Sequence, residues 1–173
     1  MAVIVGAGPN GLTAAARLAV SGWRVEVRER ASEIGGAAST QLLDDGSFRD
    51  LGAACHPFGA ASPAFRALRL EDYGVRWLRA PLEMAHPLDG GAAVLAGSLE
   101  ETAAGLGADG DAWVRLHRPV VEHVDGLLTD VLSPMTRVPR HPVALARFGA
   151  RGLWPAAALG RAAFRAEEAR ALL

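Results

Sequence analysis

The sequence predicts an α/β fold in which a parallel strand–helix–strand unit comes first and a mostly helical region follows. Residues 2–5 (AVIV) form a short apolar run that ends at Gly6, a pattern typical of a parallel strand buried on both faces. Residues 11–20 place apolar side chains at helical spacing, and residues 24–28 alternate charged residues with valines, as a strand does. Because the joints between these segments are short, we expect a right-handed parallel crossover.

Turn and capping signals predict the remaining elements. Residues 44–46 (DDG) indicate a hairpin turn between extended segments, and residues 88–91 indicate a second tight turn between short strands. The expected extended segments of the first hairpin are residues 39–43 and 47–51. Helices are expected to start at Ser62 and Ser98, to cover residues 111–131 with a break at Pro119, and to cover residues 161–173. We therefore expect one domain over residues 1–60 and a mostly helical partial region over residues 61–173.

Composition excludes several classes of partner. The 18 basic residues are all Arg and stand against 19 acidic ones, so the net charge of −1 provides no electrostatic footprint for nucleic acid. The single cysteine, Cys55, rules out an internal disulfide and fits a reducing cytosol. His117 and His123 are six residues apart, which is not a metal-ligand spacing, so we expect no metal site.

The first turn carries a glycine motif whose context gives each glycine a physical role. Residues 6–11 read Gly6-Ala7-Gly8-Pro9-Asn10-Gly11, which is G-x-G-x-x-G between a strand and a helix. Gly6 permits the tight turn, Gly8 lets a pyrophosphate approach the backbone, and Gly11 lets helix and strand pack closely. The helix N-terminus then offers amide donors and a positive dipole end to the phosphates. The motif predicts a dinucleotide site.

Glu29 lies 18 residues beyond Gly11 at the end of the second predicted strand. A carboxylate there can accept hydrogen bonds from both ribose hydroxyls of a dinucleotide, although a solvated surface charge is the alternative. The carboxylate would repel a 2′-phosphate, while the neighbouring Arg28 and Arg30 keep NADP as a minor alternative.

A second glycine motif, the pair Gly35-Gly36, distinguishes an FAD site from an NAD(P) site. Its spacing after Glu29 resembles Rossmann-type FAD enzymes with a G-G signature: amine oxidases, protoporphyrinogen oxidases and carotenoid desaturases. In that family the pair allows close approach of the backbone to the FAD diphosphate and ribityl region. Many relatives have Arg after the glycines, whereas this chain has Ala37, which argues against the amine oxidase branch.

Further motifs narrow the resemblance to phytoene dehydrogenase-like FAD oxidoreductases. These motifs are residues 37–40 (AAST), 48–52 (FRDLG), 62–63 (SP), 73–77 (YGVRW) and 86–90 (HPLDG). The resemblance implies FAD as cofactor, a hydrophobic unsaturated substrate, and dehydrogenase, desaturase or isomerase chemistry. The implied cofactor contacts are Gly6, Ala7, Gly8, Pro9, Asn10, Gly11, Glu29, Arg30, Gly35, Gly36 and Ala37. Family chains are much longer than this one and complete the FAD domain with a C-terminal segment, so we expect an N-terminal fragment.

Other features leave alternatives open. Cys55-His56 would pass near the flavin in such a family, but a structural thiol beside a structural histidine is the simpler interpretation. Residues 143–164 are apolar with interspersed arginines, so they predict either a buried cap helix interrupted by Pro155 or contact with a membrane surface. The rival functions are an NAD(P)-binding Rossmann protein and a non-catalytic nucleotide-binding remnant.

Overall fold

The computed structural model describes residues 1–53, 55–134 and 136–173, and the chain divides into two compact units. The first unit is Met1–Trp77 and the second is Leu78–Leu173. The first unit thus includes the short helices that follow residue 60. Within the described residues, no helix is long and apolar enough to cross a membrane.

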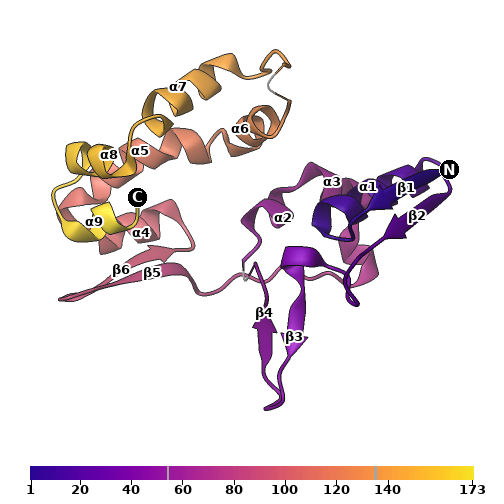
Figure 1. Ribbon diagram of the computed structural model, residues 1–173. Helices are drawn as coiled ribbons and strands as arrows, with labels where there is room; N and C mark the ends of the chain where they lie inside the picture. Colours follow the sequence, from indigo (N-terminus) through magenta and orange to yellow (C-terminus); the bar gives the residue numbers. More distant parts are fainter. Residues whose placement is uncertain (54, 135) are drawn as a thin grey trace. The chain divides into compact units, whose positions relative to one another are not determined.

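The first unit begins with the expected strand–helix–strand crossover (Figure 1). Strand β1 (Ala2–Val5) pairs in parallel with β2 (Val25–Arg28), and helix α1 (Pro9–Val20) connects them. The helix starts at Pro9 rather than at Gly11 because the fixed φ of proline suits the first helical position.

The expectation that β1 is buried on both faces is wrong for the described residues. The exposed fractions of Val3 and Val5 are 44% and 85%, whereas Ile4 lies under α1 and is only partly exposed. The reason is that α1 packs on the face of this two-stranded sheet that carries Ile4, whereas the described elements leave the face that carries Val3 and Val5 largely open. Apolar runs do not distinguish this arrangement from a fully covered strand.

The rest of the first unit is built from short elements. They are the 3₁₀ turn η1 (Gly36–Ala38), strands β3 (Thr40–Leu42) and β4 (Phe48–Asp50), helices α2 (Pro57–Ala61) and α3 (Pro63–Leu68), and the 3₁₀ turn η2 (Leu70–Tyr73). The predicted hairpin is confirmed, since β3 and β4 are antiparallel and the Asp45 carboxylate accepts from the amide and hydroxyl of Ser47 in the turn. The predicted helix start at Ser62 is also confirmed: its hydroxyl accepts from the Phe65 amide.

The second unit is a hairpin covered by helices. Its elements are β5 (Leu82–Leu88), β6 (Gly91–Ala96), α4 (Leu99–Gly105), the 3₁₀ turn η3 (Gly107–Asp109), α5 (Gly110–Val121), α6 (Val124–Val131), α7 (Pro142–Gly152), α8 (Ala156–Ala163) and α9 (Glu167–Ala171). Both α4 and α9 pack against β6 (Figure 1). The core cluster consists of Ala93, Leu106, Trp113, Phe164, Ala169 and Leu172.

Two helix predictions in this unit need correction. The break expected at Pro119 falls instead at residues 122–123. Proline has no N–H to donate to the preceding turn, but the loss of this one hydrogen bond does not end the helix at Pro119 itself. Residues 161–173 form two helix segments rather than one. The Asp109 carboxylate accepts hydrogen bonds from the amides of Arg165 and Ala166, and so fixes the turn between α8 and α9.

Candidate functional site

The candidate site of the first unit is the turn between β1 and α1. Gly6 has a φ of +96°, a conformation that favours glycine, and its amide donates to the Arg28 carbonyl at 2.7 Å. Gly8 is the N-cap residue of α1, with Pro9 following, and no side chain caps this helix end. The first-turn amides of a helix have no intrahelical partner, so this end presents donors and a positive dipole to a ligand.

Glycines 8 and 11 differ in what a side chain would meet. A Cβ atom added to Gly11 would overlap the carbonyl oxygen of Gly6, so only glycine lets α1 approach the end of β1. A Cβ added to Gly8 would meet no atom within 4 Å, so it would project into open space at the helix N-terminus. Gly11 therefore serves packing, while Gly8 keeps space free where a phosphate would approach.

Glu29 follows β2 and reaches back to the glycine turn. Its Oε2 accepts from the Ala7 amide at 2.7 Å, and its Oε1 accepts from the amides of Arg30 at 2.8 Å and Ala31 at 2.9 Å. These backbone donors, with Ala31 contributing most, lower the pKa of Glu29 below its usual value, so the side chain is ionised. A carboxylate has about four acceptor positions, which leaves room at Oε2 for one further donor.

The second glycine pair lies directly against the first motif. The Gly35 amide donates to the Ala7 carbonyl at 2.8 Å, and Gly35 and Gly36 have φ angles of +114° and +56°. A Cβ on Gly36 would come within 3.1 Å of the Gly8 Cα, so the two glycine segments approach each other as backbones. The structure thus brings together both glycine motifs and Glu29.

Arg30 and Ala37 lie at the edges of this arrangement. The Arg30 side chain is exposed, and the residue contacts Glu29 through its backbone amide. Ala37 packs against the following loop, where a Cβ on Gly52 would come within 3.0 Å of the Ala37 Cα.

A cavity of about 630 Å³ extends from Glu29 along the second glycine pair to the β3–β4 hairpin. Its polar lining includes Ser32, Ser39, Thr40 and Gln41, none of which the sequence analysis predicted as a cofactor contact. The Ser39 hydroxyl donates to the Gly36 carbonyl at 2.7 Å, so Ser39 also fixes the turn that carries the glycine pair. The sequence signals for Ser39 are its place three residues after Gly36 and its position in the motif at residues 37–40 (AAST).

The other candidates from the sequence do not join this site. Cys55 is exposed, and His56 is the N-cap residue of α2 without a side-chain cap bond. His117 and His123, in the second unit, each place Nδ1 3.0 Å from a carbonyl oxygen one turn earlier, that of Trp113 and of Pro119. Among the residues that the structure describes, no group of three or more His, Cys, Asp or Glu is placed to hold a metal ion.

Comparison with known proteins agrees with the geometry. Residues 4–69 match the family model of the NAD(P)-binding Rossmann-like domain. Among solved structures, a mutant from a redesign of cofactor binding in putrescine oxidase is similar, with 22% sequence identity and a TM-score of 0.51. The similarity covers 98% of this chain and 34% of the oxidase chain. No curated protein matches the sequence.

These findings define the class of fold. The chain is an α/β protein with a Rossmann-like nucleotide-binding domain followed by a mostly helical remainder, which confirms the predicted fold class. It spans about a third of the length of the oxidase, and at this level of identity the similarity shows the fold.

Proposed function

We propose that the first unit binds the adenosine-diphosphate end of FAD. The pyrophosphate would lie at Gly8 and the N-terminus of α1, and Oε2 of Glu29 would accept a ribose hydroxyl at its remaining acceptor position. Gly35 and Gly36 would approach the inner diphosphate as bare backbone. The remaining proposed cofactor contacts are neighbours of these residues in the sequence: Ala7, Pro9, Asn10, Gly11, Arg30 and Ala37.

One observation carries the choice of FAD over a nicotinamide dinucleotide. The Gly35-Gly36 turn is hydrogen-bonded to Ala7 and lies against Gly8, so the chain folds back over the phosphate-binding turn. A nicotinamide site requires only the first glycine motif and the acidic residue. The second turn, with the cavity beside it, suits a longer cofactor that continues beyond the pyrophosphate.

The match to an NAD(P)-binding family model favours a second candidate, an NAD(P)-binding protein. NADP fits the described residues less well than NAD. The ionised Glu29 would repel a 2′-phosphate, and Nε of Arg28 is 2.7 Å from a Glu26 carboxylate oxygen, so that cation already has an acidic partner.

We further propose that the whole protein is an FAD-dependent oxidoreductase of the phytoene dehydrogenase-like group, acting on a hydrophobic unsaturated substrate. FAD would supply hydride acceptance, and the residues described above would hold and orient its ADP end. Ala37, where many relatives with the G-G signature have Arg, supports this group over the amine oxidase branch.

The absorption spectrum of the purified protein tests the proposal. We expect a flavin spectrum and release of FAD on denaturation. A colourless protein that binds NADH would overturn the FAD assignment in favour of the nicotinamide alternative. A colourless protein that binds neither cofactor would overturn both and leave a non-catalytic remnant.

A further inference from the structure

The second unit contains a groove of about 860 Å³ that takes no part in the dinucleotide site. It lies between helices α5, α6 and α7, and Leu159 of α8 and Leu173 also line it. Its volume falls in the range of about 300–1,000 Å³ that small-molecule sites occupy. Its lining is mostly apolar and includes Val120, Leu127, Val143, Phe148 and Leu159.

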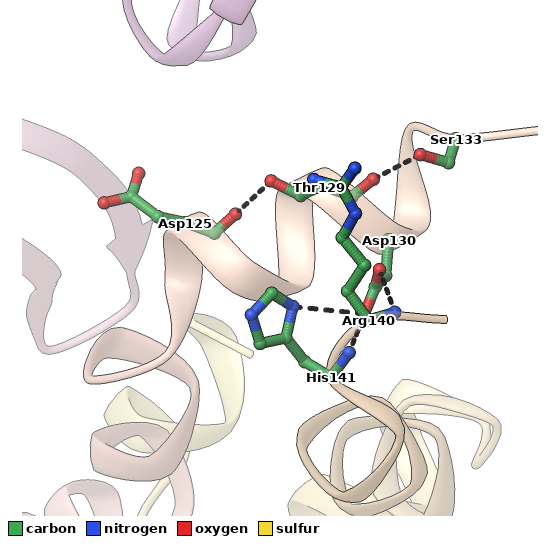
Figure 2. A network of polar contacts seen from close by, with 6 residues as sticks. All are labelled: Asp125, Thr129, Asp130, Ser133, Arg140 and His141. Atoms are coloured by element: carbon green, nitrogen blue, oxygen red, sulfur yellow. Dashed lines mark hydrogen bonds and ion pairs between the residues drawn. The ribbon is translucent and has the colours of Figure 1, made fainter. Parts of the chain in front are cut away.

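One wall of the groove is fixed by the polar network around Asp130 (Figure 2). The Asp130 carboxylate accepts from the amides of Arg140 at 2.8 Å and His141 at 2.7 Å, which holds the start of α7 against the end of α6. These bonds, with the Arg140 amide contributing most, lower the pKa of Asp130. The Thr129 hydroxyl donates to the Asp125 carbonyl within α6 (Figure 2). These hydrogen bonds therefore fix the position of α7, which forms one wall of the groove, relative to α6.

Among the side chains that line the groove, those that carry or can carry a charge are all basic. The described lining contains Arg147, Arg151 and three histidines, and it contains no Asp or Glu. Arg147 and Arg151 are one helical turn apart on α7, so they lie on the same side of that helix. Arg147 is exposed and makes no hydrogen bond or ion pair with other described residues. Arg151 donates one bond, to the Leu116 carbonyl at 3.3 Å, and keeps its other donors.

Two of the lining histidines, His117 and His141, have close partners. Burial lowers the pKa of His117, whose ring also packs on Trp113 with 3.9 Å between ring centres, so His117 is neutral at physiological pH. Nδ1 of His141 is 3.4 Å from the Asp130 carboxylate, so any charge on His141 has an acidic partner. Arg147 and Arg151 are the permanent cations of the lining, because an arginine stays protonated at physiological pH.

We propose that this groove binds a single-chain amphiphile with a terminal carboxylate, such as a fatty acid. The apolar chain would lie along Leu127 and Phe148, and the carboxylate would pair with Arg147, assisted by Arg151. Arginine suits this role because its planar guanidinium pairs with a carboxylate through two parallel hydrogen bonds. The proposal goes beyond the dinucleotide site and does not depend on it.

Charge argues for this occupant over others. A neutral hydrocarbon would leave the Arg147 charge without a partner, and an organic cation such as a polyamine would be repelled by both arginines. A second copy of the chain would bring the same basic residues together at a two-fold interface.

Calorimetric titration of the full chain with laurate, dodecanol and dodecylamine, each kept below the concentration at which it forms micelles or separates from water, tests the proposal. The three probes share one chain length and differ in the head group. We expect laurate to bind about tenfold more tightly than dodecanol, because a charge-assisted pair adds about that much, and dodecylamine to bind most weakly. Arg147→Glu should remove this preference for laurate. Its matched control is Arg161→Glu, which reverses an exposed charge on α8 outside the groove and should leave binding unchanged.

The results that would overturn the proposal can be told apart from one another. Equal affinity for laurate and dodecanol, no binding of laurate, or equal losses in the two Arg→Glu variants would each overturn the proposal. Binding to phosphatidylcholine vesicles without binding of monomeric laurate would show instead that the groove faces a membrane. A dimer by light scattering that Arg147→Glu alters would assign it to a second copy. Gly8→Ala, which we expect to weaken FAD binding roughly 5- to 150-fold, should leave laurate binding intact, so the two proposals fail separately.

Discussion

Substitution of Gly8 and of Gly11 by alanine separates binding from folding at the proposed cofactor site. Gly8 has a φ of −77°, which alanine adopts freely, and its added Cβ would contact no atom of the chain. The Cβ of Gly11→Ala would overlap the Gly6 carbonyl oxygen, and a backbone atom cannot rotate away as a side chain can. An added methyl group is therefore expected to impair cofactor binding at Gly8 and to lower the stability of the fold at Gly11.

The magnitudes follow from these contacts. For Gly8→Ala we expect the free energy of unfolding to stay within about 0.5 kcal/mol of the wild type. The methyl group would occupy phosphate space, and an overpacking cost of about 1–3 kcal/mol corresponds to a roughly 5- to 150-fold weaker affinity for FAD. For Gly11→Ala we expect a loss of at least about 1 kcal/mol of stability, which lowers the Tm by roughly 4–8 °C in a unit of this size.

Differential scanning calorimetry without ligand and FAD titration by flavin fluorescence measure the two effects. The reasoning is refuted if Gly8→Ala binds FAD as tightly as the wild type, because no phosphate then approaches the Gly8 backbone. It is also refuted if both variants lose the same stability, because the two glycines then have the same structural role.

The remaining predictions concern Glu29 and the core of the second unit. Glu29→Gln should weaken FAD binding at least about tenfold in a fluorescence titration, since the site loses charge-assisted bonds, while Glu26→Gln on the adjoining strand should not. Because the pKa of Glu29 is lowered in the folded chain, its contribution to stability is fully present above the unfolded pKa and is lost as the pH falls through the folded value. FAD affinity should therefore hold down to about pH 4.3, the ordinary value for Glu, and decline only below it; a decline that begins near neutral pH would contradict this. Trp113→Ala should cost about 3–5 kcal/mol by calorimetry because Trp113 is 3% exposed in the core of the second unit, and Trp154→Ala, at 54% exposed, should change stability by less than about 0.5 kcal/mol.

Local signals predicted much of the first unit and its candidate site. The glycine motif, the alternation of residues 24–28 and the spacing to Glu29 all depend on neighbours close in sequence, and the structure brings these parts together. The same holds for the N-caps at Ser62 and Ser98, where a hydroxyl accepts from an amide three residues on. Whether these residues bind a cofactor stays a prediction.

Features that depend on distant partners could not be predicted. The turn before α9 exists because Asp109 caps amides 56 and 57 residues away, and no periodicity records such a bond. The exposure of Val5 depends on how many elements cover β1, which an apolar run does not reveal. The groove needs three helices and the Asp130 network to exist, although its arginines were visible as interruptions of an apolar segment.

The central claim is that both glycine turns and Glu29 hold the ADP end of FAD, and calorimetric competition tests it most directly. FAD is titrated into the chain alone, with ADP present, and with FMN present. We expect FAD to bind, ADP to displace it, and FMN, which lacks the adenosine half, to leave it in place. Displacement by FMN but not by ADP would contradict the account, because the site would then recognise the flavin end.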